Sequence, residues 1–206
     1  MTTPWDVVAD EQIIQKTIQA LENNEIHAVV VNTGKEAKEK ALELIPNGSE
    51  VMTMTSVTLD SIGVSEELNK KDGKYTSVRD KLYAMDRKTQ HQEMNRLGTA
   101  PEYAIGSVHA VTEDGQVLIA SNTGSQLPAY VYGASHVIWV VGAQKIVKNM
   151  NEGMKRIYEY TLPLESERAK KAYGVPGSAV NKILIINKEV QKGRISLIFV
   201  REKLGF

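Results

Sequence analysis

Residues 136–141 read His-Val-Ile-Trp-Val-Val, and this apolar run decides the fold class. A short run of this kind, rich in β-branched residues, is typical of a strand that is buried on both faces of a sheet. Further strands are predicted at residues 26–31, 51–54, 183–186 and 195–200. Helical patterns alternate with these runs. The sequence therefore predicts an α/β fold with a mostly parallel sheet that is covered by helices.

The helical segments follow from apolar spacing and end signals. Ile14, Ile18 and Leu21 share one helical face, with Asp10 as the predicted N-cap and residues 23–24 as the end. Further helices are predicted over residues 35–44, 59–68, 89–97 and 151–160, the last of them ended by Pro163. No domain boundary is evident, so we expect residues 1–206 to form a single domain.

Two hairpins are also predicted. Asp114-Gly115 separates the apolar runs 109–112 and 116–120, and both residues tolerate positive φ. This hairpin would make the sheet mixed rather than purely parallel. The polar segment 187–194 contains Gly193 and is expected to join the last two strands as a second hairpin.

Composition excludes several function classes. The chain has 206 residues and no cysteine, which removes disulfides, thiolate nucleophiles and cysteine-bound iron–sulfur clusters from it. Lys+Arg and Asp+Glu are both 25, and a neutral chain without a basic cluster argues against nucleic-acid binding. No apolar run approaches the roughly 20 residues that span a bilayer. The N-terminus lacks the basic and apolar regions of a secretory signal, so we expect a cytoplasmic protein.

Two candidate ligand loops follow predicted strands. Thr33 and Gly34 follow the first strand, and Ser56 and Thr58 follow the second. Thr33 and Glu36 have the spacing of a capping box, and Ser56 is placed to cap the next helix. The same groups could bind a carboxylate or phosphate at the carboxyl edge of the sheet. Both interpretations stay open.

Two later loops carry further candidates. Glu113, at the first hairpin turn, is either a solvent-exposed acid or a nucleophilic or general-base carboxylate. Residues 122–126 form either a connecting loop or a backbone cradle for a ligand; they are Asn122, Thr123, Gly124, Ser125 and Gln126. His109 could face a cleft beside Glu113, and no two histidines have the spacing of a metal site.

Three stretches have a recognisable order and spacing. They are Ser56-x-Thr58-Leu59-x-x-Ile62-Gly63, the run Ala110-Val111-Thr112-Glu113-Asp114-Gly115-Gln116-Val117, and the run from His136 to Val147. With the ending Leu204-Gly205-Phe206, they resemble the LUD family, the lactate-utilisation domain that includes the C subunit of the bacterial lactate-utilisation system. The resemblance implies a fold like the NagB/RpiA/CoA-transferase group, a three-layer α/β/α arrangement on a mixed, mostly parallel sheet.

The resemblance also bears on the candidate residues. CoA transferases of the first type use a glutamate in a Ser-Glu-Asn-Gly motif, to which residues 112–115 are similar in outline; Thr112 and Asp114 depart from it. Many relatives have an arginine in the loop that matches residues 122–126, where this chain has Ser125-Gln126. Anion recognition there would use backbone amides, hydroxyls and Lys145.

The resemblance also concerns cofactors and partners. Some relatives carry a cysteine-rich segment where this chain has residues 173–177, so an iron–sulfur cluster would lie in a partner subunit. The leading hypothesis is a protein that binds a small anionic metabolite and acts, with partner subunits, in the use of lactate or a related organic acid. One alternative is a stand-alone acyl-CoA-type transferase or hydrolase that uses Glu113. Another is a non-enzymatic scaffold subunit, and a homo-oligomer is also possible.

Overall fold

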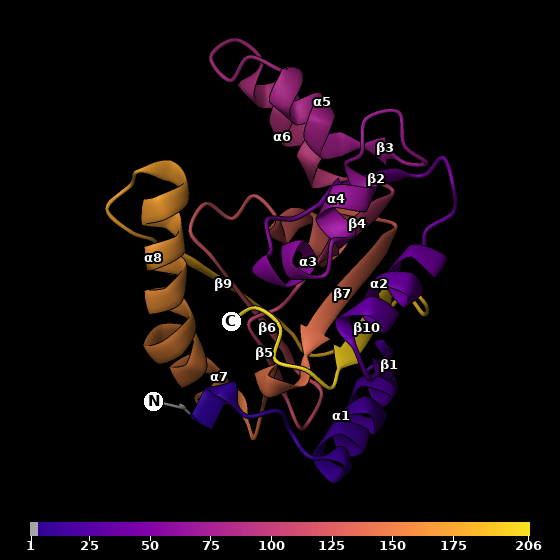
Figure 1. The fold of residues 1–206 in the computed structure, drawn as a ribbon, viewed down its shortest axis with the longest axis vertical. Helices are drawn as coiled ribbons and strands as arrows, with labels where there is room; N and C mark the ends of the chain where they lie inside the picture. Colours follow the sequence, from indigo (N-terminus) through magenta and orange to yellow (C-terminus); the bar gives the residue numbers. More distant parts are fainter. Residues whose placement is uncertain (1–3) are drawn as a thin grey trace.

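A six-stranded parallel sheet lies at the centre of the computed structural model, which describes residues 4–206 (Figure 1). Its strand order is β1-β10-β7-β4-β2-β3, and every neighbouring pair is parallel. The strands are β1 (His27–Val31), β2 (Glu50–Thr53), β3 (Thr76–Ser77), β4 (Tyr103–Gly106), β7 (His136–Gly142) and β10 (Ile195–Val200). In β7, every residue after His136 is buried, as the run at 136–141 predicts.

A second sheet of four strands packs against one face of the first. Its order is β8-β5-β6-β9, made of β5 (Ala110–Thr112), β6 (Val117–Ser121), β8 (Ile146–Val147) and β9 (Lys182–Ile186). The predicted hairpin joins β5 and β6, with Gly115 at a φ of 80°. Its strands do not join the main sheet, so mixed pairing is confined to the second sheet. Val111 and Ile119 pack in one core with Trp139 and Phe199 of the main sheet.

Helices cover the outer faces of the two sheets and confirm the α/β class. On the free face of the main sheet lie α2 (Gly34–Glu43), α3 (Val57–Ser61) and α4 (Val64–Leu68), whose Ala41 and Leu59 pack with Val140. Beside the second sheet lies α1 (Glu11–Asn23), capped by Asp10 as predicted, since its carboxylate accepts from Ile13 N at 2.9 Å. Beyond the second sheet lie α7 (Met150–Lys155), the π-helical turn η4 (Arg156–Thr161) and α8 (Leu162–Tyr173).

Two helices form an arm that projects from this body. They are α5 (Val78–Ala84) and α6 (His91–Thr99), at the top of Figure 1. Short turns complete the chain: η1 (Pro4–Asp6), η2 (Ala129–Gly133) and η3 (Ala143–Lys145). Between residues 4 and 206, no helix has both the length and the hydropathy to cross a membrane.

Three local predictions are wrong. The last two strands form no hairpin, because β9 pairs with β6 in the second sheet while β10 lies between β1 and β7. Pro163 does not end a helix; it lies in the first turn of α8, where a missing N–H costs no hydrogen bond. The helix predicted over residues 59–68 is split into α3 and α4 by Gly63, whose φ is 70°.

Candidate functional site

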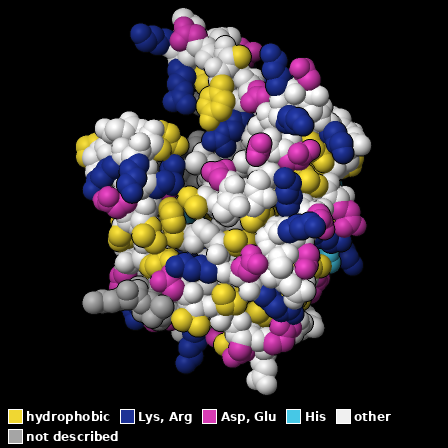
Figure 2. All heavy atoms as spheres, viewed as in Figure 1, with side chains coloured by type: hydrophobic (Ala, Val, Ile, Leu, Met, Phe, Trp, Pro, Cys, Tyr) yellow, Lys and Arg dark blue, Asp and Glu magenta, His cyan; other side chains and the backbone are white. Residues whose placement is uncertain are grey.

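A cavity of about 1260 Å³ opens at the carboxyl ends of β2 and β4. In parallel α/β sheets this edge is where ligands bind. Its walls come from the β2–α3 segment, the α5–α6 arm, the loop after β6, and α8 with the segment that follows it. Figure 2 shows the molecule hollowed between the arm and α8, with Lys and Arg side chains gathered at the opening.

Lys145 forms the inner end of the cavity and is 2% exposed. It ends η3, the turn that follows the central strand β7. Its Nζ donates to Thr58 Oγ1 at 3.2 Å, Ser107 Oγ at 3.1 Å and the Val108 carbonyl at 3.2 Å. All these acceptors are neutral, and no carboxylate of the described chain lies within ion-pair distance.

This environment disfavours a charged lysine. Burial lowers the pKa of Lys145 well below its ordinary value, and the nearby charge of Arg156 lowers it further. An anion in the cavity would supply the missing opposite charge and favour the protonated amine. The position is therefore suited to a group that binds negative charge, since it gains most when an anion arrives.

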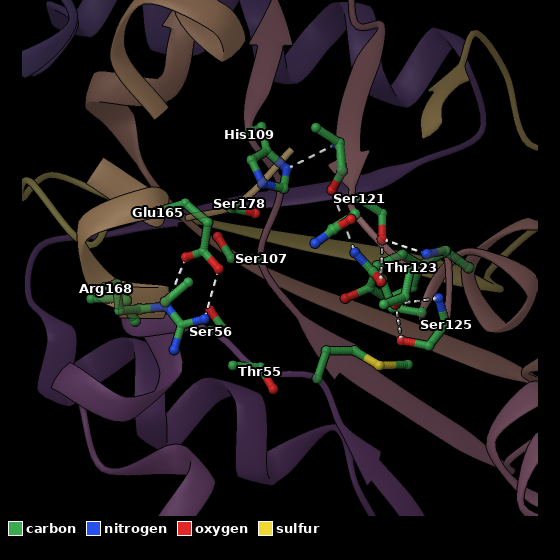
Figure 3. A pocket seen from close by; sticks show the side chains of 18 of the residues that line it. Thr55, Ser56, Ser107, His109, Ser121, Thr123, Ser125, Glu165, Arg168 and Ser178 are labelled. Carbon is green, nitrogen blue, oxygen red and sulfur yellow. Dashed lines mark hydrogen bonds and ion pairs between the residues drawn. The ribbon is translucent and has the colours of Figure 1, made fainter. Parts of the chain in front are cut away.

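His109 contributes a second polar group to the same wall. Its Nδ1 accepts from the Ala120 backbone N–H at 3.1 Å, which assigns the proton of the neutral ring to Nε2. Burial, then the charges of Lys145 and Arg156, lower the pKa of His109 to about 3. Figure 3 shows the ring at the cavity wall, with its second nitrogen turned toward the open space. His109 thus offers a neutral N–H donor.

Arg156 lies behind His109 and is fully buried. Its Nη1 donates to the His109 carbonyl and to Thr161 Oγ1, and its guanidinium lies 5.1 Å from the centre of the Tyr160 ring. Its Nε and Nη2 have no hydrogen-bond partner among residues 4–206. Burial lowers the pKa of Arg156 to about 10, so the group stays charged at neutral pH. It adds positive potential behind the inner end of the cavity.

The outer end carries further cations. Arg79 of α5 donates from Nη1 to the Thr53 carbonyl at 3.1 Å and from Nη2 to Thr55 Oγ1 at 2.8 Å. Arg87, in the turn of the arm, is exposed and also lines the cavity. Neither arginine has an ion-pair partner in the part of the chain that the structure describes. Both therefore present uncompensated positive charge.

On the opposite wall, α8, a basic and an acidic side chain that line the cavity neutralise each other. Arg168 donates from Nε and Nη2 to the two carboxylate oxygens of Glu165, at 2.7 and 2.6 Å (Figure 3). Glu165 is the one acidic residue among the described lining residues. In a chain of zero net charge, the cavity thus holds an excess of basic groups, namely Arg79, Arg87 and Lys145, the last of which an anion would help to protonate.

The predicted cradle at residues 122–126 lines this cavity together with Ser56, Thr58 and Lys145. Most of its polar groups are used to fold the loop itself. Ser121 Oγ donates to Gln126 Oε1 at 2.9 Å and accepts from Gly124 N at 2.8 Å, and Asn122 Oδ1 accepts from Asn181 at 2.7 Å. Thr123 and Ser125 are exposed, and their hydroxyls lie 3.1 Å apart. The loop therefore forms one wall of the cavity, with two exposed hydroxyls at its tip.

Tyr130 closes the floor of the cavity beside the last residue of β4. A Cβ on Gly106 would lie 1.9 Å from Tyr130 Oη, so only glycine leaves room for this hydroxyl. The Tyr130 ring meets Trp139 edge-on, with centroids 5.5 Å apart. Burial raises the pKa of the Tyr130 phenol, which keeps it neutral and able to donate a hydrogen bond.

Thr33 and Gly34 lie elsewhere, beside a separate pocket of about 450 Å³. They form the predicted capping box: Glu36 N donates to Thr33 Oγ1 at 3.2 Å and Asn32 N to Glu36 Oε2 at 2.8 Å. The Glu202 carboxylate already accepts from Gly34 N at 3.0 Å. The expected convergence of these residues with the other loops is therefore wrong, and their amides are engaged within the protein.

Glu113 also lies outside the cavity. Its Oε2 accepts from Lys16 Nζ of α1 at 2.7 Å, and it is not among the residues that line the site. The turn that carries it packs against α1, where Asn24 Nδ2 donates to the Asp114 carbonyl at 3.1 Å. His109 does reach the cavity, as expected, but without Glu113 beside it.

Several residues that line the cavity were not predicted from the sequence. Ser107 and His109 follow β4, which was not predicted because two of its four residues are alanine and glycine, both depleted in strands. Arg79 and Arg87 lie on a polar helical arm whose position depends on the tertiary fold. Gly106 offers the one local signal, a glycine at the end of an apolar strand.

These features define an α/β protein with a cation-rich cavity at the carboxyl edge of a parallel sheet. The chain belongs to the LUD domain family, which matches it over residues 14–200. The resemblance seen in the sequence motifs is thereby confirmed.

Two solved structures are similar to this chain. A DUF162 family protein from Deinococcus radiodurans aligns with a TM-score of 0.55 and 9% identity, over 94% of this chain and 99% of that one. This similarity supports the fold alone. A D-ribose-5-phosphate isomerase in complex with phospho-erythronic acid aligns with a TM-score of 0.42 and 13% identity, over 83% and 95% of the two chains, and we base nothing on it. No curated protein matches the sequence.

Proposed function

We propose that this LUD-domain protein binds a small organic anion in the cavity, with Lys145 as the group that receives its negative charge. The observation that carries the proposal is the set of uncompensated cations, Lys145, Arg79 and Arg87, in one cavity of a chain with zero net charge. Buried charges are ordinarily paired. A cavity that keeps a buried lysine without a carboxylate is suited to an anionic ligand.

The neutral donors support the same class of ligand. Ser107 and His109 lie near the Lys145 amine, and hydroxyl and imidazole N–H groups donate to carboxylate or phosphate oxygens. Together they offer hydrogen bonds to several oxygens of one small group. An organic acid presents such a group.

For the cellular role, we propose participation in the use of lactate or a related organic acid, with partner subunits, as the family's name suggests. The 206 residues contain no cysteine, so a cysteine-bound iron–sulfur cluster in such an assembly would belong to a partner. The cavity would then bind the organic acid or a product derived from it.

A thermal-shift panel tests the binding proposal. It contains lactate, other 2-hydroxy and 2-oxo acids, sugar phosphates, acyl-CoA, folates and nucleotides, each with the wild-type protein and with Lys145→Met. A ligand at about 100 times its dissociation constant stabilises by about 2.7 kcal/mol. For a domain of this size, that raises the melting temperature by about 5–10 °C. The proposal predicts a rise with one anionic class that Lys145→Met lowers; no rise with any anion would overturn it.

A further inference from the structure

We infer that the cavity binds an elongated ligand with an anionic group at each end, an organic acid that carries a second carboxylate or a phosphate. This inference rests on the proposed function and specifies the ligand of the same site. Its basis is the arrangement of Lys145 and Arg79, which hold the two ends of one segment of the cavity wall.

The segment is the connection from β2 to α3. Arg79 donates to Thr53 O and to Thr55 Oγ1, at 3.1 and 2.8 Å, while Lys145 donates to Thr58 Oγ1 at 3.2 Å. The Cα atoms of Thr55 and Thr58 are at most about 11 Å apart, because that is the contour length between them. The two cations therefore contact one wall of the cavity at residues that are at most about 11 Å apart.

Both cations lack a compensating charge in the described protein. Their hydrogen-bond partners are hydroxyl and carbonyl oxygens, and Glu165, the acidic residue of the lining, is bound through both oxygens to Arg168. Arg87 adds a second unpaired cation on the arm. A ligand with one anionic group would neutralise only one end. A ligand with two would neutralise both.

The inner and outer ends of the cavity suit different anionic groups of the ligand. The inner end is compact, with the buried Lys145 amine among small hydroxyl side chains, which fits a carboxylate. At the outer end, Arg79 uses its three nitrogens on Thr53, Thr55 and Tyr83, and its guanidinium has more N–H groups than these acceptors occupy. A guanidinium fork matches the oxygens of phosphate or carboxylate in pairs.

The size of the cavity supports the same conclusion. Pockets of about 300–1,000 Å³ hold drug-sized ligands, and this cavity has about 1260 Å³. Lactate has a single charge and would fill a small part of it. A longer acid with a second anionic group reaches from Lys145 to the arm.

Calorimetric titration with matched probes tests the inference. 3-Phosphoglycerate and 6-phosphogluconate carry both groups at two lengths, and 2-oxoglutarate is the dicarboxylate. Glycerate and glycerol 3-phosphate each carry one end of 3-phosphoglycerate. We expect at least one two-ended probe to bind at least about tenfold more tightly than either single-ended probe, a difference of about 1.4 kcal/mol.

Substitutions of Lys145 and Arg79 test which of these two residues binds which anionic group of the ligand. Lys145→Met should reduce the affinity for the two-ended probe to the single-ended level, and so should Arg79→Gln. Lys145→Met should weaken glycerate binding more than glycerol 3-phosphate binding, whereas Arg79→Gln should weaken glycerol 3-phosphate binding more. Because Arg79 also holds Thr53, two further variants separate its charge from its structural role. Arg79→Lys keeps the charge and should restore part of the affinity that Arg79→Gln loses. Arg87→Gln removes an exposed cation of the cavity lining and should weaken binding.

The outcomes separate this inference from the proposed function. If glycerate or lactate binds as tightly as every two-ended probe and the arginine variants change nothing, the two-ended ligand is wrong while anion binding at Lys145 stands. If no anion binds, or if binding is unchanged in Lys145→Met, both are wrong.

Discussion

Lys145 Nζ lies 3.2 Å from Thr58 Oγ1, although 87 residues separate them in the sequence. This contact joins the turn after the central strand β7 to the helix that follows β2. It places an amine without an acidic partner at the deepest point of the cavity. The predictions below follow from that arrangement and from the groups around it.

Lys145→Met should weaken anion binding without lowering stability. Methionine keeps the unbranched stem and removes a buried charge, and replacing buried charges by apolar groups is often neutral or stabilising. We expect the free energy of unfolding to stay within about 1 kcal/mol of wild type or to rise. Urea denaturation and calorimetry measure the two effects. Lys16→Met, which removes an exposed lysine, is the control and should keep binding.

A purely structural lysine would behave differently. In that case, loss of its hydrogen bonds to Thr58, Ser107 and Val108 would destabilise Lys145→Met, while the remaining cations would preserve ligand binding. That combination contradicts the account.

Anion binding should be accompanied by proton uptake. The pKa of Lys145 is lowered in the free protein, and a bound anion raises it again. Between these two values the complex holds more protons than the free protein, so affinity falls as pH rises through that interval. Calorimetry in buffers with different ionisation enthalpies gives the number of protons. In Lys145→Met, any residual binding should take up fewer protons.

His109 should contribute to acid denaturation. Its pKa is about 3 in the folded protein, against 6.5 for an ordinary histidine, so the unfolded chain binds the proton more readily. The stability from this group is present above pH 6.5 and is lost as pH falls toward 3. Between pH 6.5 and 5 the loss is about 2 kcal/mol.

A variant isolates this effect. His109→Asn keeps a side-chain acceptor for Ala120 N but cannot titrate, so its stability should fall less steeply with acid. Urea melts at several pH values measure the slope. His91→Asn, at an exposed position of α6, should keep the wild-type slope; an unchanged slope in His109→Asn would count against the buried neutral ring.

Gly106→Ala should destabilise the floor of the cavity. The new Cβ would lie 1.9 Å from Tyr130 Oη and 3.2 Å from Met54 Cβ, and overpacking of this kind costs about 1–3 kcal/mol. Gly98→Ala is the matched control in α6, where the Cβ would meet Leu82 Cδ1 at 3.8 Å. There, replacing a helical glycine should stabilise by about 0.5–1 kcal/mol. Equal effects of the two variants in thermal melts would refute the close packing of Tyr130.

Glu113→Gln should leave ligand binding unchanged. Its carboxylate faces Lys16 on α1 rather than the cavity, and ion pairs near the surface contribute about 0–1 kcal/mol. Calorimetry with the best ligand of the panel measures the affinity. Loss of binding in this variant would show that the turn at residues 112–115 belongs to the site.

Local signals in the sequence predicted the local structure well. The apolar run at 136–141 forms most of the central strand β7, Asp10 caps α1, and Asp114-Gly115 forms the hairpin turn. Each of these depends on neighbouring residues alone. The α/β class follows from their order along the chain.

The pairing of strands was less predictable, because an apolar run does not specify its partner. Residues 187–194 look like a hairpin connection, yet they lead from one sheet to the other. The segment is fixed by tertiary contacts: Arg194 donates to the Tyr130 carbonyl at 2.7 Å, and Glu189 N donates to the Asn24 carbonyl at 2.9 Å. Such contacts between distant residues leave no local pattern.

The site was predicted in part for the same reason. Ser56, Thr58, Lys145 and residues 122–126 do line one cavity. Thr33 and Glu113 have equally suggestive local patterns, but their side chains satisfy a helix cap and an ion pair. The cations of the arm were missed because they reach the cavity only through the packing of α5 against β2.

A crystal structure grown with the anion that gives the largest melting-temperature rise in the panel tests the central claim most directly. The account predicts that anion in the cavity, with an oxygen within hydrogen-bond distance of Lys145 Nζ and with His109 Nε2 on the same wall. An anion bound beside Gly34 and Lys38 instead, with the cavity at Lys145 empty, would contradict it.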